Sequence, residues 1–220
     1  DRDRIAYGSC DLFYSQNNGT NWTKPVNLGP KINSKHWETQ PSFASDGKTL
    51  YFIRGMNYDR QRRNPNNQDI YVTEILENGQ WSTPRKLSSK INTPYREESV
   101  QIHPDGKTLY FASNGHPGMG GLDIYMSRKL EDDSWSKPIN LGFPVNTFLN
   151  ENSILISPKG DLGYFSSDRE GGFGDLDLYS FILSDKFKPQ PITYLKGRII
   201  DAETKLPLTA SFQLSDLEKE

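Results

Sequence analysis

Short apolar runs alternate with polar positions along most of the chain, and the whole pattern returns three times. In the clearest copy, residues 97–125, Val100 and Ile102 alternate with polar neighbours, as do Leu109 and Phe111. A period of two predicts β-strands with a buried face. We expect four strands in this copy, near residues 97–103, 108–113, 122–129 and 134–141.

The three copies share landmarks at matching positions. Each has an opening glutamate, a tight-turn pair, a Tyr-Phe pair and an Asp-aliphatic-Tyr triplet. These are Glu38, Glu97 and Glu151; Asp46-Gly47, Asp105-Gly106 and Lys159-Gly160; Tyr51-Phe52, Tyr110-Phe111 and Tyr164-Phe165; and the triplets that begin at Asp69, Asp123 and Asp177. The opening glutamates are 59 and then 54 residues apart. Self-similarity at such a spacing, with several short strands per copy, is typical of a β-propeller. One such sheet would leave apolar faces wet, so we expect the copies to stack around an axis.

We therefore predict an all-β chain that contains β-propeller blades, each a sheet of four antiparallel strands. Residues 1–30 are expected to be the last half of a preceding blade, because Asp11-Leu12-Phe13-Tyr14 and Trp22 repeat landmarks of the later copies. Residues 31–193 form three blades, and residues 194–220 begin a β-sandwich. So few blades make a partial ring. Either a preceding part of a larger protein is absent here, or a partner chain or another copy completes the ring.

Composition excludes several classes of function. The net charge of −2 gives no electrostatic case for binding nucleic acid or an anionic membrane. No apolar run is long enough for a transmembrane helix. Cys10 is the single cysteine and cannot form an internal disulfide. We therefore expect no nucleic-acid partner and no transmembrane segment.

Loops on one face of the ring are the candidate binding surface. The connections between blades and the loops between second and third strands share a face, and long loops commonly carry function. Trp37, Tyr95 and Phe148 lie in the three interblade connections, and aromatic residues are enriched at interfaces. The alternative is that each of them packs between adjacent blades.

The longest loop on that face, residues 54–68, is basic and carries Arg60, Arg62 and Arg63. These arginines are candidates for contact with an acidic partner or with glycan carboxylates. The alternative is a solvated surface insertion.

No catalytic or metal-binding constellation stands out. Glu38, Glu97 and Glu151 could supply paired carboxylates for hydrolysis, but their recurrence favours a structural role, capping backbone N–H groups in the neighbouring loop. Asp123 and Asp177 lie beside glycine-rich loops; calcium would need six or more convergent oxygens, so we expect them to accept hydrogen bonds from the loop backbone. The tryptophans Trp22, Trp81 and Trp135 are expected to pack the blades. We predict no catalytic residue, metal or cofactor.

A glycan-binding or glycan-hydrolysing propeller is the alternative function. The stretch Ser15–Trp22 approximates the Asp-box turn of sialidase propellers, S-x-D-x-G-x-x-W, with Asn17 in place of the aspartate. That motif shapes a hairpin and lies apart from the sialidase active site.

The segments PDGKTLYFASN…GMGGLDIY and SPKGDLGYFSSDREGGFGDLDLY resemble the TolB-type, WD-repeat-like propeller modules of bacterial envelope proteins. The resemblance is greatest to OmpA-family proteins of the Bacteroidetes, in which such a propeller precedes a carboxypeptidase-regulatory-like β-sandwich. Residues 196–208 are similar to the opening of that sandwich. Residues 54–68 depart from the glycine-rich loop of the family pattern.

This resemblance implies a non-enzymatic scaffold in the periplasm or at the outer membrane of a Gram-negative bacterium, with protein partners in the cell envelope. Some members of the family belong to type IX secretion and gliding complexes. Anchoring to peptidoglycan would be supplied by an OmpA-like domain that is not present in this sequence.

Overall fold

The structure is a computed structural model that describes residues 6–56, 67–193 and 199–210. Its described residues form four antiparallel sheets and one short 3-10 helix, with no α-helix among them. Arg60, Arg62 and Arg63 lie outside the described residues.

The strands follow the chain in order, and each sheet is a simple meander. A two-stranded sheet holds β1 (Phe13–Tyr14) and β2 (Val26–Asn27). The first complete blade holds β3 (Trp37–Phe43), β4 (Thr49–Met56), β5 (Asn67–Glu74) and β6 (Arg85–Lys86). The second holds β7 (Glu97–Ile102), β8 (Thr108–Ser113), β9 (Asp123–Arg128) and β10 (Ile139–Asn140). The last sheet holds β11 (Glu151–Ile156), β12 (Leu162–Ser167) and β13 (Asp177–Ile182).

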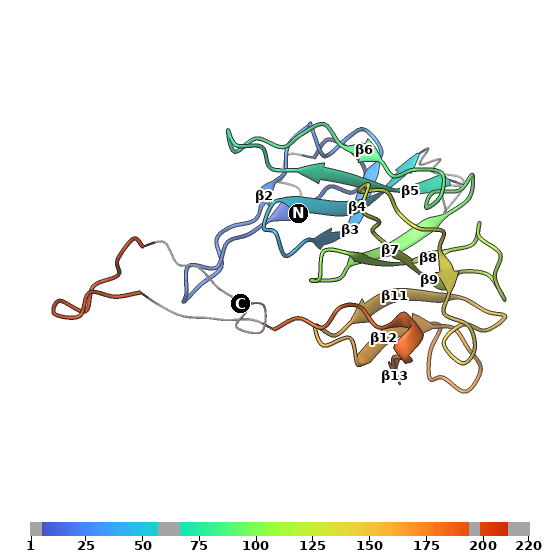
Figure 1. Cartoon of the computed structure of the whole chain (residues 1–220). Helices are drawn as coiled ribbons and strands as arrows, with labels where there is room; N and C mark the ends of the chain where they lie inside the picture. Colours follow the sequence, from blue (N-terminus) through green and yellow to red (C-terminus); the bar gives the residue numbers. More distant parts are fainter. Residues whose placement is uncertain (1–5, 57–66, 194–198, 211–220) are drawn as a thin grey trace.

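Successive sheets stack face to face in chain order, with β7 in contact with β3 on one side and β11 on the other (Figure 1). Burial follows from this stacking. All residues of β7 and β8 are buried, because a sheet covers each face, whereas β13 alternates between half-buried and exposed residues. The all-β propeller architecture predicted from the repeat is confirmed.

The Tyr-Phe pairs show how one strand serves two interfaces. Phe52 packs with Leu12 and Ile32 toward the preceding sheet, whereas Tyr51 packs with Leu109 toward the following sheet. Phe111 and Tyr110 are divided between the two sides in the same way. Neighbouring side chains on a strand point to opposite faces, so these two pairs contribute to the apolar cores on both sides of their sheets. In the last sheet only Phe165 is in a core, and Tyr164 is exposed.

The first strand of each copy contains a bulge with a left-handed residue, at Gln40 (φ 48°), Ser99 (φ 55°) and Ser153 (φ 55°). The bulges form bonds across the stack. The backbone N–H of Ser99 donates to Gln40 Oε1 at 2.8 Å, and that of Ser153 donates to Ser99 Oγ at 2.7 Å. Since a bulge leaves a residue unpaired within its own sheet, these bonds use the freed groups to join neighbouring blades.

Polar residues on β7, the first strand of the second complete blade, depart from the expectation of a single buried face. Glu98 and Gln101 are buried with the apolar residues of β7. Gln101 bonds both backbone groups of Ile156, accepting from the N–H at 2.7 Å and donating to the carbonyl at 3.1 Å. A buried polar side chain is tolerated when its hydrogen bonds are satisfied, so the polar face of this strand is also an interface.

The outermost strands differ most from the prediction. The strand expected at 134–141 is reduced to β10, with an isolated bridge between Lys129 and Trp135. Pro138 explains the shortening, because proline cannot donate a hydrogen bond to a ladder. Among the described residues that follow β13, the third copy has no fourth strand. It has instead the 3-10 helix η1 (Asp185–Phe187), which is followed by Pro189 and Pro191.

Residues 199–208 make a small hairpin, with a bridge between Ile200 and Pro207 and a hydrogen bond from the N–H of Leu208 to the carbonyl of Ile199 at 3.0 Å. The β-sandwich expected over residues 194–220 lies partly outside the described residues.

Candidate interaction surface

The loop-rich face is the end of the stack that carries the three interblade connections together with the loops that follow β4, β8 and β12. A repeated asparagine anchors each connection to the preceding sheet. Asn92 accepts a hydrogen bond from the N–H of Ile70 at 2.8 Å and donates to the carbonyl of Ile70 at 3.0 Å. Asn33 makes the same pair of bonds with Leu12, and Asn146 makes it with Ile124. A buried side chain thus replaces a strand partner.

The opening glutamates hold the other end of each connection. Glu97 accepts hydrogen bonds from the N–H and the hydroxyl of Thr93, at 2.9 and 2.7 Å, and from the hydroxyl of Ser113 at 2.8 Å. Glu38 bonds Ser34 and Glu151 bonds Thr147 with the same two contacts. The prediction that these glutamates cap backbone N–H groups in the loops is confirmed.

Burial of these carboxylates limits what they can do. The side chains of Glu38 and Glu151 are 0% exposed, and Glu97 is 0% exposed as a whole residue. Burial raises the pKa of Glu97 to about 7, although Thr93 and Ser113 favour the ionised form through hydrogen bonds. A glycan at the surface cannot reach carboxylates placed in this way, so they do not act as the hydrolytic pair considered above.

A third recurring position lies just after or at the end of the second strand of each copy, where a basic or imidazole side chain contacts a backbone carbonyl of the interblade connection. The guanidinium of Arg54 lies 4.7 Å from the centre of the Tyr71 ring and donates to Glu38 and to the carbonyl of Ile32. Arg169 repeats this arrangement in the last copy, over Tyr179 at 4.8 Å and beside Glu151. Both side chains join ring contact to ion pairing, which suits the planar guanidinium.

In the middle copy the same position holds His116, whose Nε2 lies 2.8 Å from the carbonyl oxygen of Ile91 and whose ring is 5.3 Å from that of Tyr125. Sequence reasoning missed these three residues, because they stand at different distances from the landmarks of their copies.

The glycine-rich loops are held by the aspartates that open the third strands. Asp123 accepts hydrogen bonds from the N–H groups of Met119 and Gly120, and Asp177 accepts from those of Phe173 and Gly174. The expected role of these aspartates is confirmed. Within the described ranges, no group of three or more His, Cys, Asp or Glu side chains could hold a metal ion.

Two of the interblade connections, which the buried asparagines and glutamates hold in place, present aromatic side chains to solvent. Tyr95 is 58% exposed and Phe148 is 72% exposed, so neither is packed between blades. Trp37 differs: it begins β3, is half-buried, and its indole covers Gly55, where a Cβ would lie 2.0 Å from Nε1.

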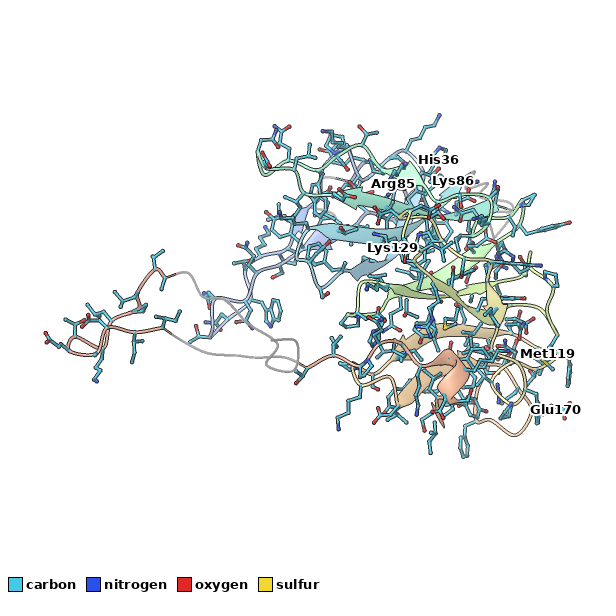
Figure 2. The ribbon with its side chains drawn as sticks, viewed as in Figure 1. His36, Arg85, Lys86, Met119, Lys129 and Glu170 are labelled. Atoms are coloured by element: carbon cyan, nitrogen blue, oxygen red, sulfur yellow. The ribbon has the colours of Figure 1, made fainter. Side chains whose placement is uncertain are left out.

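Met119 also lies on the loop-rich face, which the sequence did not predict. The backbone of Phe148 lies against Gly120, which brings the tip of one glycine-rich loop beside the next interblade connection. Met119 is 48% exposed. Figure 2 shows Met119 and Glu170 at the end of the sheets where the loops gather.

The tryptophans of the hairpins between third and fourth strands have different environments. Trp135 is buried edge-on against Tyr51, with ring centroids 6.2 Å apart, and Trp81 packs against Phe43 at 6.5 Å. Trp22 is 69% exposed, so the expectation that it packs a blade is wrong. Among the described residues no sheet precedes β1–β2, and Trp22 therefore lacks a neighbour to cover it. The stretch Ser15–Trp22 is a hairpin turn closed by a bridge between Asn17 and Trp22.

Comparison with solved structures finds other proteins that share part of this arrangement. TolB from Acinetobacter baumannii aligns with 17% identity and a TM-score of 0.46, over 76% of this chain and 34% of TolB. A puromycin hydrolase aligns with 17% identity and a TM-score of 0.45, over 73% of this chain and 24% of the hydrolase. The chain thus spans about a third of the first structure and about a quarter of the second.

No protein-family model matches the chain, and no curated protein matches it in sequence. Across the described residues, the structure contains no helix with the length and apolar character needed to cross a membrane.

Proposed function

We propose that this chain is a non-enzymatic interaction scaffold that binds a protein partner through its loop-rich face. The observation that carries this proposal is the exposure of Tyr95 and Phe148 on connections whose bases are fixed by buried glutamates and asparagines. A rigid aromatic side chain costs little conformational entropy when it is buried in an interface. The two aromatic side chains are therefore held on a preorganised surface before a partner binds.

The proposed setting is the bacterial cell envelope. The blade motifs that resemble OmpA-family proteins support a periplasmic or outer-membrane-associated location and membership of a type IX secretion or gliding complex. Peptidoglycan would be bound by another domain of the same protein. The burial of Glu38, Glu97 and Glu151 supports a scaffold over a glycan hydrolase.

The test is chemical crosslinking and affinity capture from native envelopes, comparing the natural protein with the double variant Tyr95→Ser and Phe148→Ser. We expect the double variant to remain folded and to lose at least tenfold of the captured partner, because interface aromatics carry much of the binding free energy.

Trp22→Ser is the matched control, since Trp22 is equally exposed and lies in a short turn away from the loop-rich face. Equal capture by the natural protein and the double variant, or loss of capture with Trp22→Ser alone, would count against the proposal.

A further inference from the structure

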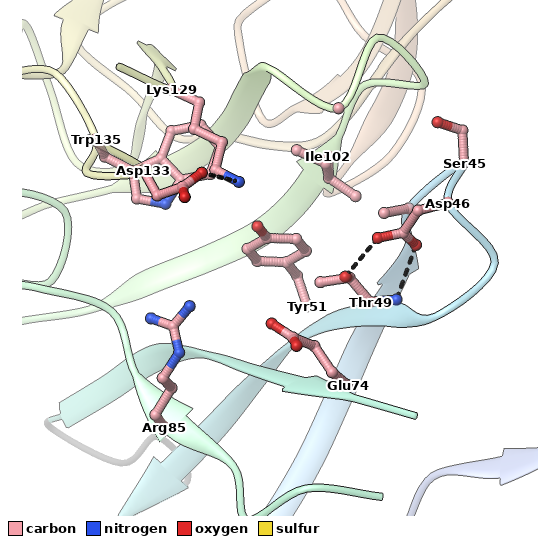
Figure 3. Close-up of a pocket in the computed structure, with 12 residues that line it drawn as sticks. Ser45, Asp46, Thr49, Tyr51, Glu74, Arg85, Ile102, Lys129, Asp133 and Trp135 are labelled. Atoms are coloured by element: carbon pink, nitrogen blue, oxygen red, sulfur yellow. Dashed lines mark hydrogen bonds and ion pairs between the residues drawn. The ribbon is translucent and has the colours of Figure 1, made fainter. Parts of the chain in front are cut away.

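The short-turn face, opposite the loop-rich face, carries a pocket between the first and second complete blades. Tyr51, Thr49, Asp46 and Glu74 line it from one blade, and Trp135 and Gly106 from the next (Figure 3). Arg85 and the ion pair Lys129–Asp133 complete the rim. The pocket therefore combines an aromatic wall with charged groups.

The same groove one blade further along is filled by the chain itself. The residues Phe187–Gln190, which follow the last sheet, lie between the second complete blade and β11–β13. Tyr110 donates its hydroxyl to the carbonyl of Phe187 at 2.6 Å, and the guanidinium of Arg128 donates to the carbonyl of Lys188. The N–H of Gln190 donates to Asp105 Oδ2 at 2.9 Å. Three side chains thus hold an extended stretch of backbone.

Strand register shows that the two grooves have equivalent walls. Thr49 pairs with Glu74 in the first complete blade, and Thr108 pairs with Arg128 in the second. The turn carboxylate accepts from the threonine hydroxyl in both, at 2.6 Å for Asp46 and 2.7 Å for Asp105. The side chain of Asp105 is 1% exposed beneath Gln190, whereas Asp46 is exposed. The open pocket therefore offers Asp46 and the Tyr51 hydroxyl where the filled groove uses Asp105 and Tyr110.

The two grooves differ in charge at one place. Glu74 stands in the open pocket at the position that Arg128 has in the filled groove. The arginine donates hydrogen bonds to a carbonyl, whereas the glutamate accepts hydrogen bonds and attracts a cation. Within the part of the chain that the structure describes, neither Glu74 nor Arg85 forms an ion pair. Burial raises the pKa of Tyr51 to about 12, so its hydroxyl remains a hydrogen-bond donor at neutral pH.

From these contacts we infer that the pocket binds an extended peptide segment that contains proline and a neighbouring lysine or arginine. The backbone would bond Tyr51 and Asp46, the proline would lie against Trp135 and Gly106, and the basic side chain would pair with Glu74. Aromatic-lined grooves suit proline-rich segments, which are already extended before they bind. In the filled groove, Pro189 packs directly on Gly160, the counterpart of Gly106.

The experiment uses the whole chain and the peptide acetyl-Phe-Lys-Pro-Gln-Pro-amide, which copies residues 187–191, with binding followed by titration calorimetry and by the NMR signal of the Trp135 indole. We expect saturable binding that weakens about five- to tenfold in Tyr51→Phe, since one hydrogen bond is lost. A similar loss is expected in Glu74→Gln and for a peptide with Glu in place of Lys.

Tyr110→Phe is the matched control, because it changes the equivalent hydroxyl of the filled groove. Affinity lost in Tyr110→Phe but kept in Tyr51→Phe would mean that the peptide displaces the chain's own segment, and would overturn the inference. Absence of binding at millimolar peptide would also overturn it, as would equal binding of the Lys and Glu peptides. If Tyr51→Phe fails to fold, the exposed Glu74→Gln variant decides the question alone.

Discussion

The side-chain amide of Asn92 pairs with both backbone polar groups of Ile70, which lies 22 residues earlier in the chain. A third bond runs from Asn92 Nδ2 to the carbonyl of Leu87 at 3.0 Å. These bonds tie an interblade connection to the third and fourth strands of the sheet before it. Each copy has its own version of the contact, so the asparagine determines how one blade leads to the next.

Replacing Asn92 with alanine is expected to lower the free energy of unfolding by about 3 kcal/mol, because buried backbone groups of Ile70 and Leu87 lose their partner. Urea denaturation measures the change. Asn78→Ala is the control: Asn78 lies in an exposed turn, where its Oδ1 accepts from the N–H of Gln80, and its loss should cost less than 1 kcal/mol. Equal effects of the two substitutions would contradict the anchoring role.

Glu97 should make stability depend on pH. Its pKa is about 7 in the folded protein and 4.5 as the unperturbed value, so the folded state binds the proton more tightly than the unfolded chain. The stabilisation is complete below pH 4.5 and is lost as pH rises to about 7, by at most about 3 kcal/mol.

The measurement is the unfolding free energy from pH 4 to pH 8 for the natural protein and for Glu97→Gln. We expect the difference between them to fall through this window and to be level outside it. Glu77→Gln, on an exposed turn, is the control and should run parallel to the natural protein. Parallel profiles for Glu97→Gln would exclude the buried carboxyl as the cause.

Gly160→Ala tests the contact that holds the chain's own segment in its groove. The glycine has φ +71°, and an added Cβ would lie 2.4 Å from Pro189. Gly106 has φ +67° at the equivalent turn position, with nothing within 4 Å of an added Cβ. Gly106→Ala should therefore show the backbone cost alone, about 1 kcal/mol, and Gly160→Ala should lose about 1–2 kcal/mol more.

Trypsin provides a second readout of Gly160→Ala, because cleavage after Lys186 should accelerate when Pro189 is displaced. Identical cleavage rates and stabilities in the two glycine variants would show that the segment does not depend on this contact.

The open face of the last sheet should promote self-association. Leu178 is 74% exposed and Ile182 is 84% exposed, whereas Ile70 and Ile124, the counterparts of Leu178, are fully buried beneath a following sheet. Exposed apolar patches of this kind favour association. The double variant Leu178→Ser and Ile182→Thr should reduce concentration-dependent association in analytical ultracentrifugation. Leu76→Ser, on a turn, is the control, and an unchanged association of the double variant would locate the contact elsewhere.

The local features of each blade could be predicted from the sequence. Alternation of apolar and polar residues indicated the strands, Asp-Gly pairs indicated the turns, and the recurring glutamates indicated the caps. The sequence also places an asparagine five residues before each opening glutamate, as at Asn92 and Glu97, although it does not reveal the partner of Asn92. That partner lies on a different strand, and nothing in the spacing identifies it.

By itself, the sequence determined that the chain repeats a small sheet that must stack to bury its apolar residues. Only the tertiary structure decided which side chains the stack covers. Tyr110 is buried and Tyr164 is 37% exposed although both occupy the same place in the repeat, because among the described residues a following sheet covers only Tyr110. The structure likewise placed Phe187–Gln190 in one groove and left its counterpart open, since burial and pairing depend on what lies against a residue in space.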